Sequence, residues 1–297
     1  SRPPAMLGWR LAYFAGWWDS LVHVRVVDRI GDALLMRIGN PASYGPLGWG
    51  GPRVSLPALL ATLQREAGTE FEDVGLTDVS LLTVEVETIA AEERAFGPEL
   101  VHWPLVGVEA PAFETVCAGA GAATGECPAT AQPEELHAGV RKKLAASYDT
   151  WDADGLTAKV EELRAKLIQS AHEQQPQIIF FHCNCGCDRT GMLAAAYSMR
   201  YLNKTFTEAM GVAEQVAGRN LVYRFQVGAQ WYCESLIKKG LYHGYDCGNC
   251  APFRCQDTGD PVDAHYGMVL GAIMLAACVT LGGVAFLGRR CARRCRK

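Results

Sequence analysis

Alternation of apolar and polar residues predicts several strands and one helix in the first third of the chain. Residues 21–28 (LVHVRVVD) are rich in β-branched side chains and alternate as a half-buried strand does. Residues 53–66 follow a loop rich in Gly and Pro and have the apolar spacing of an amphipathic helix. Two further short runs, residues 81–87 and 101–106, are predicted as strands.

The second half of the chain alternates between helical and strand patterns. Residues 134–148 and 155–173 have helical periodicity, and they follow an Ala- and Gly-rich stretch, residues 107–133, which we expect to be a surface insertion. Residues 177–181 (QIIFF) are apolar without alternation, as expected of a strand buried on both faces. A tight loop and a helix that begins near Arg189 come next. This order predicts an α/β layered fold in which helices flank a central, mostly parallel sheet.

A long apolar segment marks the carboxyl-terminal end. Residues 266–288 carry no charge over 23 positions, which is enough for a helix to cross a hydrocarbon layer about 30 Å thick. We therefore expect a C-terminal transmembrane helix in the lipid bilayer. The predicted organisation is a folded domain over residues 1–245, a cysteine-containing stalk over 246–265, the transmembrane helix, and a basic tail over 289–297.

The distribution of charge predicts the orientation of this span. The formal net charge is −4, but the tail holds six of the 28 Lys and Arg residues, so the rest has 22 basic against 32 acidic groups and a net charge of −10. Such an acidic body argues against nucleic acid as a partner. Because cationic flanks stay in the cytosol, we expect a single-pass membrane protein with a cytosolic C-terminus and its folded domain lumenal or extracellular.

The loop after the buried strand carries the candidate chemistry, and it reads HCNCGCDRTG over residues 182–191. Cys183 lies between a strand and a helix, where backbone N–H groups at the helix N-terminus form a cradle for an anion and favour a nucleophilic thiolate. Gly186 permits a tight backbone path, and Arg189 can present its guanidinium fork to two phosphate oxygens. Thr190 is placed to hydrogen-bond the sulfur.

This segment resembles the HCxxGxxR(S/T)G motif of the cysteine-dependent protein tyrosine and dual-specificity phosphatases, with each fixed position filled. The resemblance covers about residues 75–245 and implies a phosphatase-like layered fold. It also implies that Cys183 attacks phosphorus, that Arg189 and the loop hold the phosphate, and that no metal or other cofactor is needed. The expected substrate-binding positions are Asn184, Cys185, Gly186, Cys187, Asp188 and Arg189.

Members of this family carry a general-acid Asp roughly thirty residues before the nucleophile, often in a Trp-Pro-Asp sequence. The corresponding stretch here is DTWDADG, residues 149–155, which lacks the Pro. The resemblance makes Asp152 our first choice for the acid, followed by Asp154 and then Asp149. These residues also suit caps of the helix that begins near Leu156, and Asp154 is well placed for that purpose.

Two further positions bear on the resemblance. Gln226 and Gln230 are similar to the Gln-x3-Gln segment with which other members position the hydrolytic water, so we expect this role for Gln226, with an ordinary polar helix position as the alternative. Asp188 resembles the Asp-Arg-Thr sequence of phosphoinositide phosphatases such as myotubularins. The loop has no Lys to attract a polyphosphorylated inositol headgroup, which favours a phosphoprotein substrate.

The twelve cysteines fall into groups. Cys185 and Cys187 share the loop with Cys183, so either could trap the nucleophile as a disulfide in oxidising surroundings. Cys117 and Cys127 bracket a stretch of small residues and are candidates for a loop-closing disulfide. In the stalk we expect disulfides, or alternatively a zinc site together with His243, at Cys247, Cys250 and Cys255.

Together these features predict a membrane-anchored phosphatase that hydrolyses phosphotyrosine or related phosphomonoesters through a phosphocysteine intermediate. Its expected partner is a phosphorylated protein or another phosphomonoester. Two alternatives remain. A phosphoinositide phosphatase is favoured by membrane attachment and by Asp188, and a catalytically inactive phosphate-binding, receptor-like module is favoured by the missing Pro before Asp152.

Overall fold

The computed structural model describes residues 21–44, 51–71, 73–108, 152–173, 175–242 and 247, all within the first of two compact units, Ser1–Cys255 and Gln256–Lys297. In this part of the chain, no helix is both long and apolar enough to cross a membrane. The expected transmembrane helix, stalk disulfides, helix 134–148 and disulfide between Cys117 and Cys127 lie outside these residues, apart from Cys247.

A five-stranded sheet forms the centre of the domain. Its strand order is β1 (Arg25–Ile30), β2 (Ala33–Ile38), β7 (Gln177–His182), β5 (Gly75–Ser80) and β6 (Leu100–His102). β1 is antiparallel to β2, whereas the pairs β2–β7, β7–β5 and β5–β6 are parallel. A separate two-stranded sheet pairs β3 (Ala42–Tyr44) with β4 (Pro52–Val54). The expected α/β fold with a mostly parallel central sheet is confirmed.

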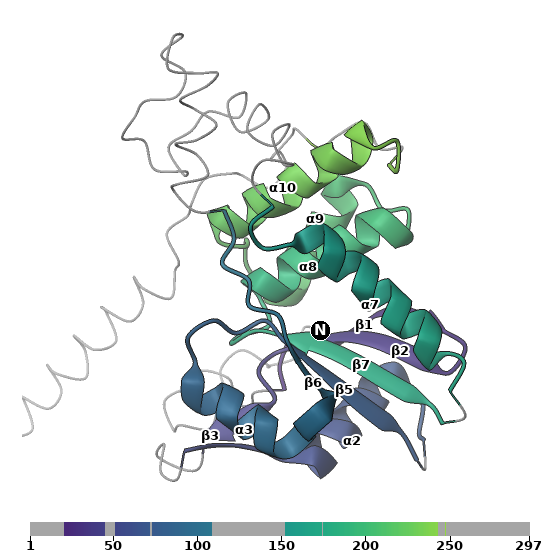
Figure 1. Cartoon of the computed structure of the whole chain (residues 1–297), viewed down its shortest axis with the longest axis vertical. Helices are drawn as coiled ribbons and strands as arrows, with labels where there is room; N and C mark the ends of the chain where they lie inside the picture. Colours follow the sequence, from purple (N-terminus) through teal and green to yellow (C-terminus); the bar gives the residue numbers. More distant parts are fainter. Residues whose placement is uncertain are drawn as a thin grey trace, which may run out of the picture. The chain divides into compact units, whose positions relative to one another are not determined.

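Helices cover both faces of this sheet (Figure 1). On one face lie α7 (Leu156–Ser170), α8 (Asp188–Tyr201), α9 (Phe206–Ala217) and α10 (Tyr223–Lys238), and on the other lie α2 (Leu56–Ala67) and α3 (Val86–Phe96). A short 3-10 turn, Gly97–Glu99, joins α3 to β6. Parallel strands need such crossover helices, so the sheet is buried on both sides.

The strand β7 lies between β2 and β5 and contributes to two hydrophobic clusters. Ile178 and Phe180 pack with the α2 and α3 side, whereas Ile179 and Phe181 pack with the α7 to α10 side. All four are buried, as expected of the QIIFF run. Because successive strand residues point to opposite faces, a strand covered on both sides must be apolar at every position.

Several strands differ from the sequence-based expectation: β1 is shifted from residues 21–28 to Arg25–Ile30, and neither β3 nor β4 was expected. The predicted strand over residues 81–87 is wrong, because the strand is β5 at Gly75–Ser80 and the residues after it lead into α3. Its apparent alternation came from Val84 and Val86, which are 78% and 73% exposed. The strand β2, a continuous ALLMRI run, was not expected at all, and β6 ends at His102 rather than Val106.

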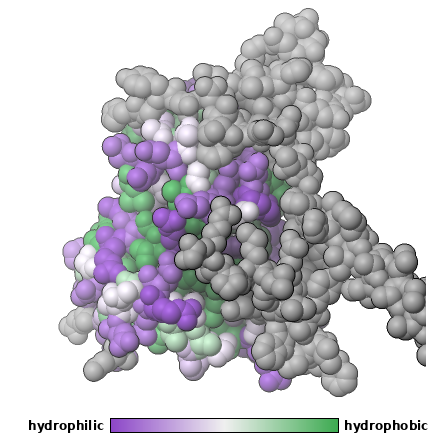
Figure 2. All heavy atoms as spheres, turned by 180° about the vertical axis from the view of Figure 1, so that it is seen from behind, coloured by the Kyte–Doolittle hydropathy of each residue, from purple (hydrophilic) through white to green (hydrophobic). Residues whose placement is uncertain are grey.

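The described surface in Figure 2 carries hydrophilic and hydrophobic residues side by side. Such mixing is ordinary for a folded domain, because polar atoms are too few to cover its whole surface. This face therefore gives no reason by itself to assign a partner, and we look for the chemistry in the loop that follows β7.

Candidate active site

The HCNCGCDRTG loop connects the carboxyl end of β7 to α8, which begins at Asp188. Gly186 in this loop has a φ of +70°. A Cβ atom at this position would collide with the backbone of Ile38 and Gly39, at the end of the neighbouring strand β2. Only glycine combines that backbone conformation with such a close approach, so the loop lies tightly against the sheet.

Cys183 lies at the start of this loop and is only 3% exposed. It is the free cysteine among the described residues. The backbone N–H groups of the loop have few acceptors: within the described residues, no hydrogen bond is donated by those of Asn184, Cys185, Gly186, Asp188 and Arg189. Unpaired amides next to a helix N-terminus can bind an oxyanion beside the sulfur.

Arg189 is anchored by three hydrogen bonds to two segments, one that follows β5 and one that follows β6. Its donors contact the carbonyl of Leu105 at 3.1 Å, a carboxylate oxygen of Glu85 at 3.2 Å and the hydroxyl of Thr83 at 3.0 Å. A guanidinium has five N–H groups, so two remain for a ligand. The fork of Arg189 is thus held in one orientation and is still able to bind an anion.

Glu85 is itself fixed before it holds Arg189. Its carboxylate accepts hydrogen bonds from the backbone N–H groups of Thr83 and Val84, each at 3.0 Å. Burial would raise the pKa of Glu85, but these two amides and the charge of Arg189 lower it overall. The carboxylate is therefore ionised and orients the guanidinium at neutral pH.

A second arginine, Arg37, lies beneath the loop and was not expected as a site residue. It comes from the middle of the sheet, is 1% exposed, and donates to the Gly186 carbonyl at 2.6 Å and the Ala213 carbonyl at 3.5 Å. No carboxylate of the described residues pairs with it. Burial lowers the pKa of Arg37 to about 10, and the nearby Cys183 opposes this effect. Its sequence signal was a lone cation within an apolar strand.

The two described acid candidates have different surroundings. The Asp152 carboxylate caps α7 by accepting from the backbone of Leu156 at 2.7 Å. Asp154, which is 4% exposed, accepts from the backbone N–H groups of Val106 and Gly107, each at 2.9 Å. Burial raises the pKa of Asp154, and the two amides oppose the rise.

Asp154 is thereby connected to the arginine of the loop. The residue before its two amide partners is Leu105, whose carbonyl accepts from Arg189. The sequence analysis assigned the better capping position to Asp154, but the structure gives the cap to Asp152. No hydrogen bond or ion pair within the described residues joins Asp152 to Cys183, and Asp149 lies outside them.

Asp188 and Gln226 hold the segment between α9 and α10. Asp188 receives two hydrogen bonds from Arg219, at 2.6 and 3.0 Å, and one from the backbone of Val222 at 2.7 Å. Gln226 donates to the Leu221 carbonyl at 2.6 Å. Both side chains therefore have structural partners, and the water-positioning role of Gln226 stays a prediction.

Thr190 is completely buried at the start of α8, and its hydroxyl has no hydrogen-bond partner among the described residues. The expected hydrogen bond to the Cys183 sulfur is not formed in this structure. Gln230 is likewise buried, and neither atom of its amide makes a hydrogen bond there.

Two disulfides are present in the described part of the chain. Cys185 pairs with Cys187 inside the loop, and Cys233 in α10 pairs with Cys247. Disulfides were expected, but with other partners: the loop cysteines pair with each other rather than with Cys183, which remains free. Cys247 had been grouped with the stalk cysteines, and its partner in α10 was not identified.

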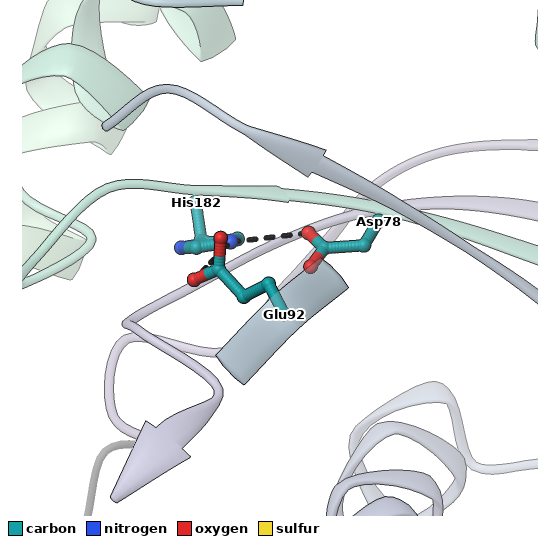
Figure 3. Close-up of side chains that lie close together, drawn as sticks. All are labelled: Asp78, Glu92 and His182. Atoms are coloured by element: carbon teal, nitrogen blue, oxygen red, sulfur yellow. Dashed lines mark ion pairs between the residues drawn. The ribbon is translucent and has the colours of Figure 1, made fainter. Parts of the chain in front are cut away.

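A group of buried ionisable side chains surrounds His182, the residue before Cys183 in the chain (Figure 3). The imidazole Nε2 of His182 is 3.0 Å from Asp78 and 3.4 Å from Glu92, and all three residues are fully buried. Burial raises the pKa of Asp78 and raises that of Glu92 to about 7. Burial alone would lower the pKa of His182, but Asp78 and Glu92 raise it to about 9. The sequence analysis did not find this group.

Comparison of the sequence with protein-family models gives no match, and comparison with curated proteins gives none either. The function must therefore be argued from the residues of the loop and their contacts.

Proposed function

We propose that this chain is a phosphatase that hydrolyses phosphotyrosine or related phosphomonoesters through a phosphocysteine intermediate. One observation carries the proposal: a free Cys183 begins a loop whose backbone amides lack acceptors and whose Arg189 keeps two N–H groups for a ligand. The resemblance of HCNCGCDRTG to the phosphatase motif supports the same conclusion.

The first step forms one bond and breaks another. The Cys183 thiolate attacks phosphorus, the bond from phosphorus to the ester oxygen breaks, and that oxygen leaves with the electron pair and a proton from a carboxylic acid. Amides of the loop and the two free N–H groups of Arg189 stabilise the charge on the other oxygens. Water then attacks phosphorus, which releases phosphate and restores the thiolate.

The contacts favour Asp154 over Asp152 as the acid. A buried carboxyl with a raised pKa keeps its proton to higher pH, and Asp154 lies next to the segment that contacts Arg189. Asp152, the first choice from the sequence, has a sufficient structural role as the cap of α7. Both assignments are tested below.

The proposal includes attachment to the membrane by a single span over residues 266–288. The phosphatase domain would then lie in a lumen or outside the cell. This part of the proposal rests on the uncharged segment and the basic tail. The two disulfides in the domain support it, because such bonds persist mainly in oxidising compartments.

A second candidate is a module that binds phosphate without turnover. It is favoured by the engagement of both Asp152 and Asp154 with backbone amides. The phosphoinositide alternative stays a prediction that rests on membrane attachment and on Asp188, whose carboxylate is held by Arg219 and the backbone of Val222.

The test is hydrolysis of para-nitrophenyl phosphate by the full chain in detergent, with and without reductant. We expect turnover that is abolished by Cys183→Ser. Phosphate binding without turnover under both conditions would favour the binding module, and the absence of both would overturn the proposal.

A further inference from the structure

The buried cluster around His182 is formed by side chains from three elements, β5, α3 and β7. Asp78 and Ser80 are two residues apart on β5 and therefore share one face of the sheet. His182 pairs in register with Ser80, and Glu92 comes from α3 above this face. Figure 3 shows the three ionisable side chains pointing toward one another.

These side chains are fully buried, and most of their polar atoms face one another. Nε2 of His182 makes ion-pair contacts with Asp78 at 3.0 Å and with Glu92 at 3.4 Å. Outside this cluster, the carboxylate oxygens of Asp78 and Glu92 and the hydroxyl of Ser80 have no hydrogen-bond partner among the described residues. Leaving such groups unsatisfied is costly, and a missing ion is one standard explanation.

The two ring nitrogens of His182 have different partners: Nδ1 faces the carbonyl of Cys183, and Nε2 faces the carboxylates. Nδ1 lies 3.3 Å from the carbonyl of Cys183, which can only accept, so Nδ1 carries the proton in this contact. Nε2 therefore faces the oxygens of Asp78 and Glu92. Three such atoms repel one another unless a positive charge lies between them, which is either a proton on Nε2 or a metal ion.

The spacing of these atoms suits a metal ion. Bonds of about 2.0–2.1 Å in tetrahedral geometry separate neighbouring ligand atoms by roughly 3.3 Å. The distances from His182 Nε2 to Asp78 and Glu92 are 3.0 and 3.4 Å, and one ligand atom of each residue lies within 4.8 Å of the others. A divalent cation would also neutralise the two carboxylates.

Two neighbouring groups complete the environment. The hydroxyl of Ser80 lies beside the Glu92 carboxylate and is a further oxygen donor. Histidines that bind metals commonly donate their other ring N–H to a carbonyl, as His182 can do to Cys183.

We propose that Asp78, Glu92 and His182 form a structural binding site for a first-row divalent metal ion of the Zn²⁺ or Co²⁺ type. One imidazole and two carboxylates are a donor set for such ions. The bound ion would join β5, α3 and the end of the strand that leads into Cys183. This proposal does not depend on the proposed phosphatase activity.

Binding of Co²⁺ to the metal-free full chain in detergent tests the site. The absorption spectrum of Co²⁺ separates oxygen and nitrogen ligands from thiolates, so ions bound by cysteines elsewhere are recognised. We expect one tightly bound ion without sulfur ligands. Because even outer-shell partners are worth about 10–100-fold in affinity, Glu92→Gln and Asp78→Asn should each weaken binding by roughly 100-fold or more. Glu93→Gln, an exposed neighbour on α3, is the matched control and should leave binding unchanged.

Two results would overturn the proposal. One is equal Co²⁺ binding by the wild-type protein and all variants, and the other is binding through thiolates alone. If a variant fails to fold, X-ray absorption at the metal edge of the wild-type protein decides, because it reports whether an imidazole and oxygen atoms surround the ion. The proposal is likewise overturned if the wild-type chain binds no such ion, in which case the cluster holds a proton instead, as an imidazolium at His182.

Discussion

At the scale of single residues, the site contains two arginines in opposite surroundings. Arg189 is paired with the ionised Glu85, whereas the buried Arg37 has only carbonyl partners among the described residues. A buried charge without a counter-ion is destabilising and is kept where an anion must bind. The loop thus combines one arginine that is oriented with one whose charge is uncompensated.

The nucleophile provides the first prediction. Cys183→Ser should lower turnover by on the order of a thousandfold or more, because a hydroxyl at this position does not ionise near neutral pH. The amides of the loop remain, so binding of vanadate, a phosphate analogue, should persist. Both are measured on the same preparation by initial rates and by equilibrium titration. Unchanged turnover would exclude the mechanism.

The acid is tested by two parallel substitutions. Asp154→Ala should lower kcat for phosphotyrosine by about 10²–10⁴-fold, and much less for an activated aryl phosphate that leaves without a proton. Asp152→Ala should mainly lower the free energy of unfolding by about 1 kcal/mol, since it removes the cap of α7. If the leaving-group dependence appears with Asp152→Ala instead, the sequence-based choice is correct and the contacts of Asp154 are structural.

Replacing Arg37 should have opposite effects on stability and on activity. Arg37→Met replaces a buried, unpaired charge by an apolar chain of similar length, and we expect a free energy of unfolding that is unchanged or higher by about 1 kcal/mol. Vanadate affinity and kcat/KM should both fall, roughly tenfold, because the site loses a positive charge near Cys183. Arg25→Gln, an exposed neighbour in register with Arg37 on the sheet, is the control and should change neither quantity. A fall in stability with unaltered affinity would contradict this account.

At the scale of elements, local order was predictable and long-range pairing was not. The β7 strand, the loop and α8 are continuous in sequence, so their pattern was sufficient to predict them. The strand β5 was missed because two of its residues, Asp78 and Ser80, are polar and yet fully buried. Glu85 and Leu105 meet Arg189 only because β5 and β6 end beside β7, which no local pattern reveals.

The junction of α9 and α10 predicts a pH-dependent stability. Burial raises the pKa of Glu214 from 4.5 to about 7, and the hydrogen bond from Leu221 opposes this. The folded state therefore binds more protons than the unfolded state between these two values, so this residue lowers stability as pH rises from about 4.5 to about 7.

We expect Glu214→Gln to remove this loss, so its advantage over the wild type should grow across that pH window and stay constant above it. Denaturant unfolding at a series of pH values measures the difference. Glu66→Gln, on the exposed side of α2, serves as the control. A constant difference between wild type and Glu214→Gln at all pH values would contradict the assignment.

At the scale of the whole molecule, the disulfides bear on the compartment. Cys233 in α10 is joined to Cys247, and Cys185 to Cys187, so the described domain suits an oxidising environment. Because Cys185 and Cys187 are paired, the loop holds no second free thiol with which Cys183 could be oxidised to a disulfide. Its thiolate still lies in the same loop as a disulfide that it can attack by exchange, so turnover should depend on reductant.

The last prediction concerns topology, which decides which substrates the site can meet. Six cationic residues follow the uncharged segment 266–288, so the tail should lie in the cytosol and the domain on the other side of the membrane. In sealed vesicles from cells that express the complete gene product, external protease should shorten the chain by no more than this tail. Asn203, exposed between α8 and α9, should carry glycan if the host glycosylates its sequon. Complete digestion of the domain without detergent would reverse the orientation and make cytosolic phosphoproteins the expected substrates.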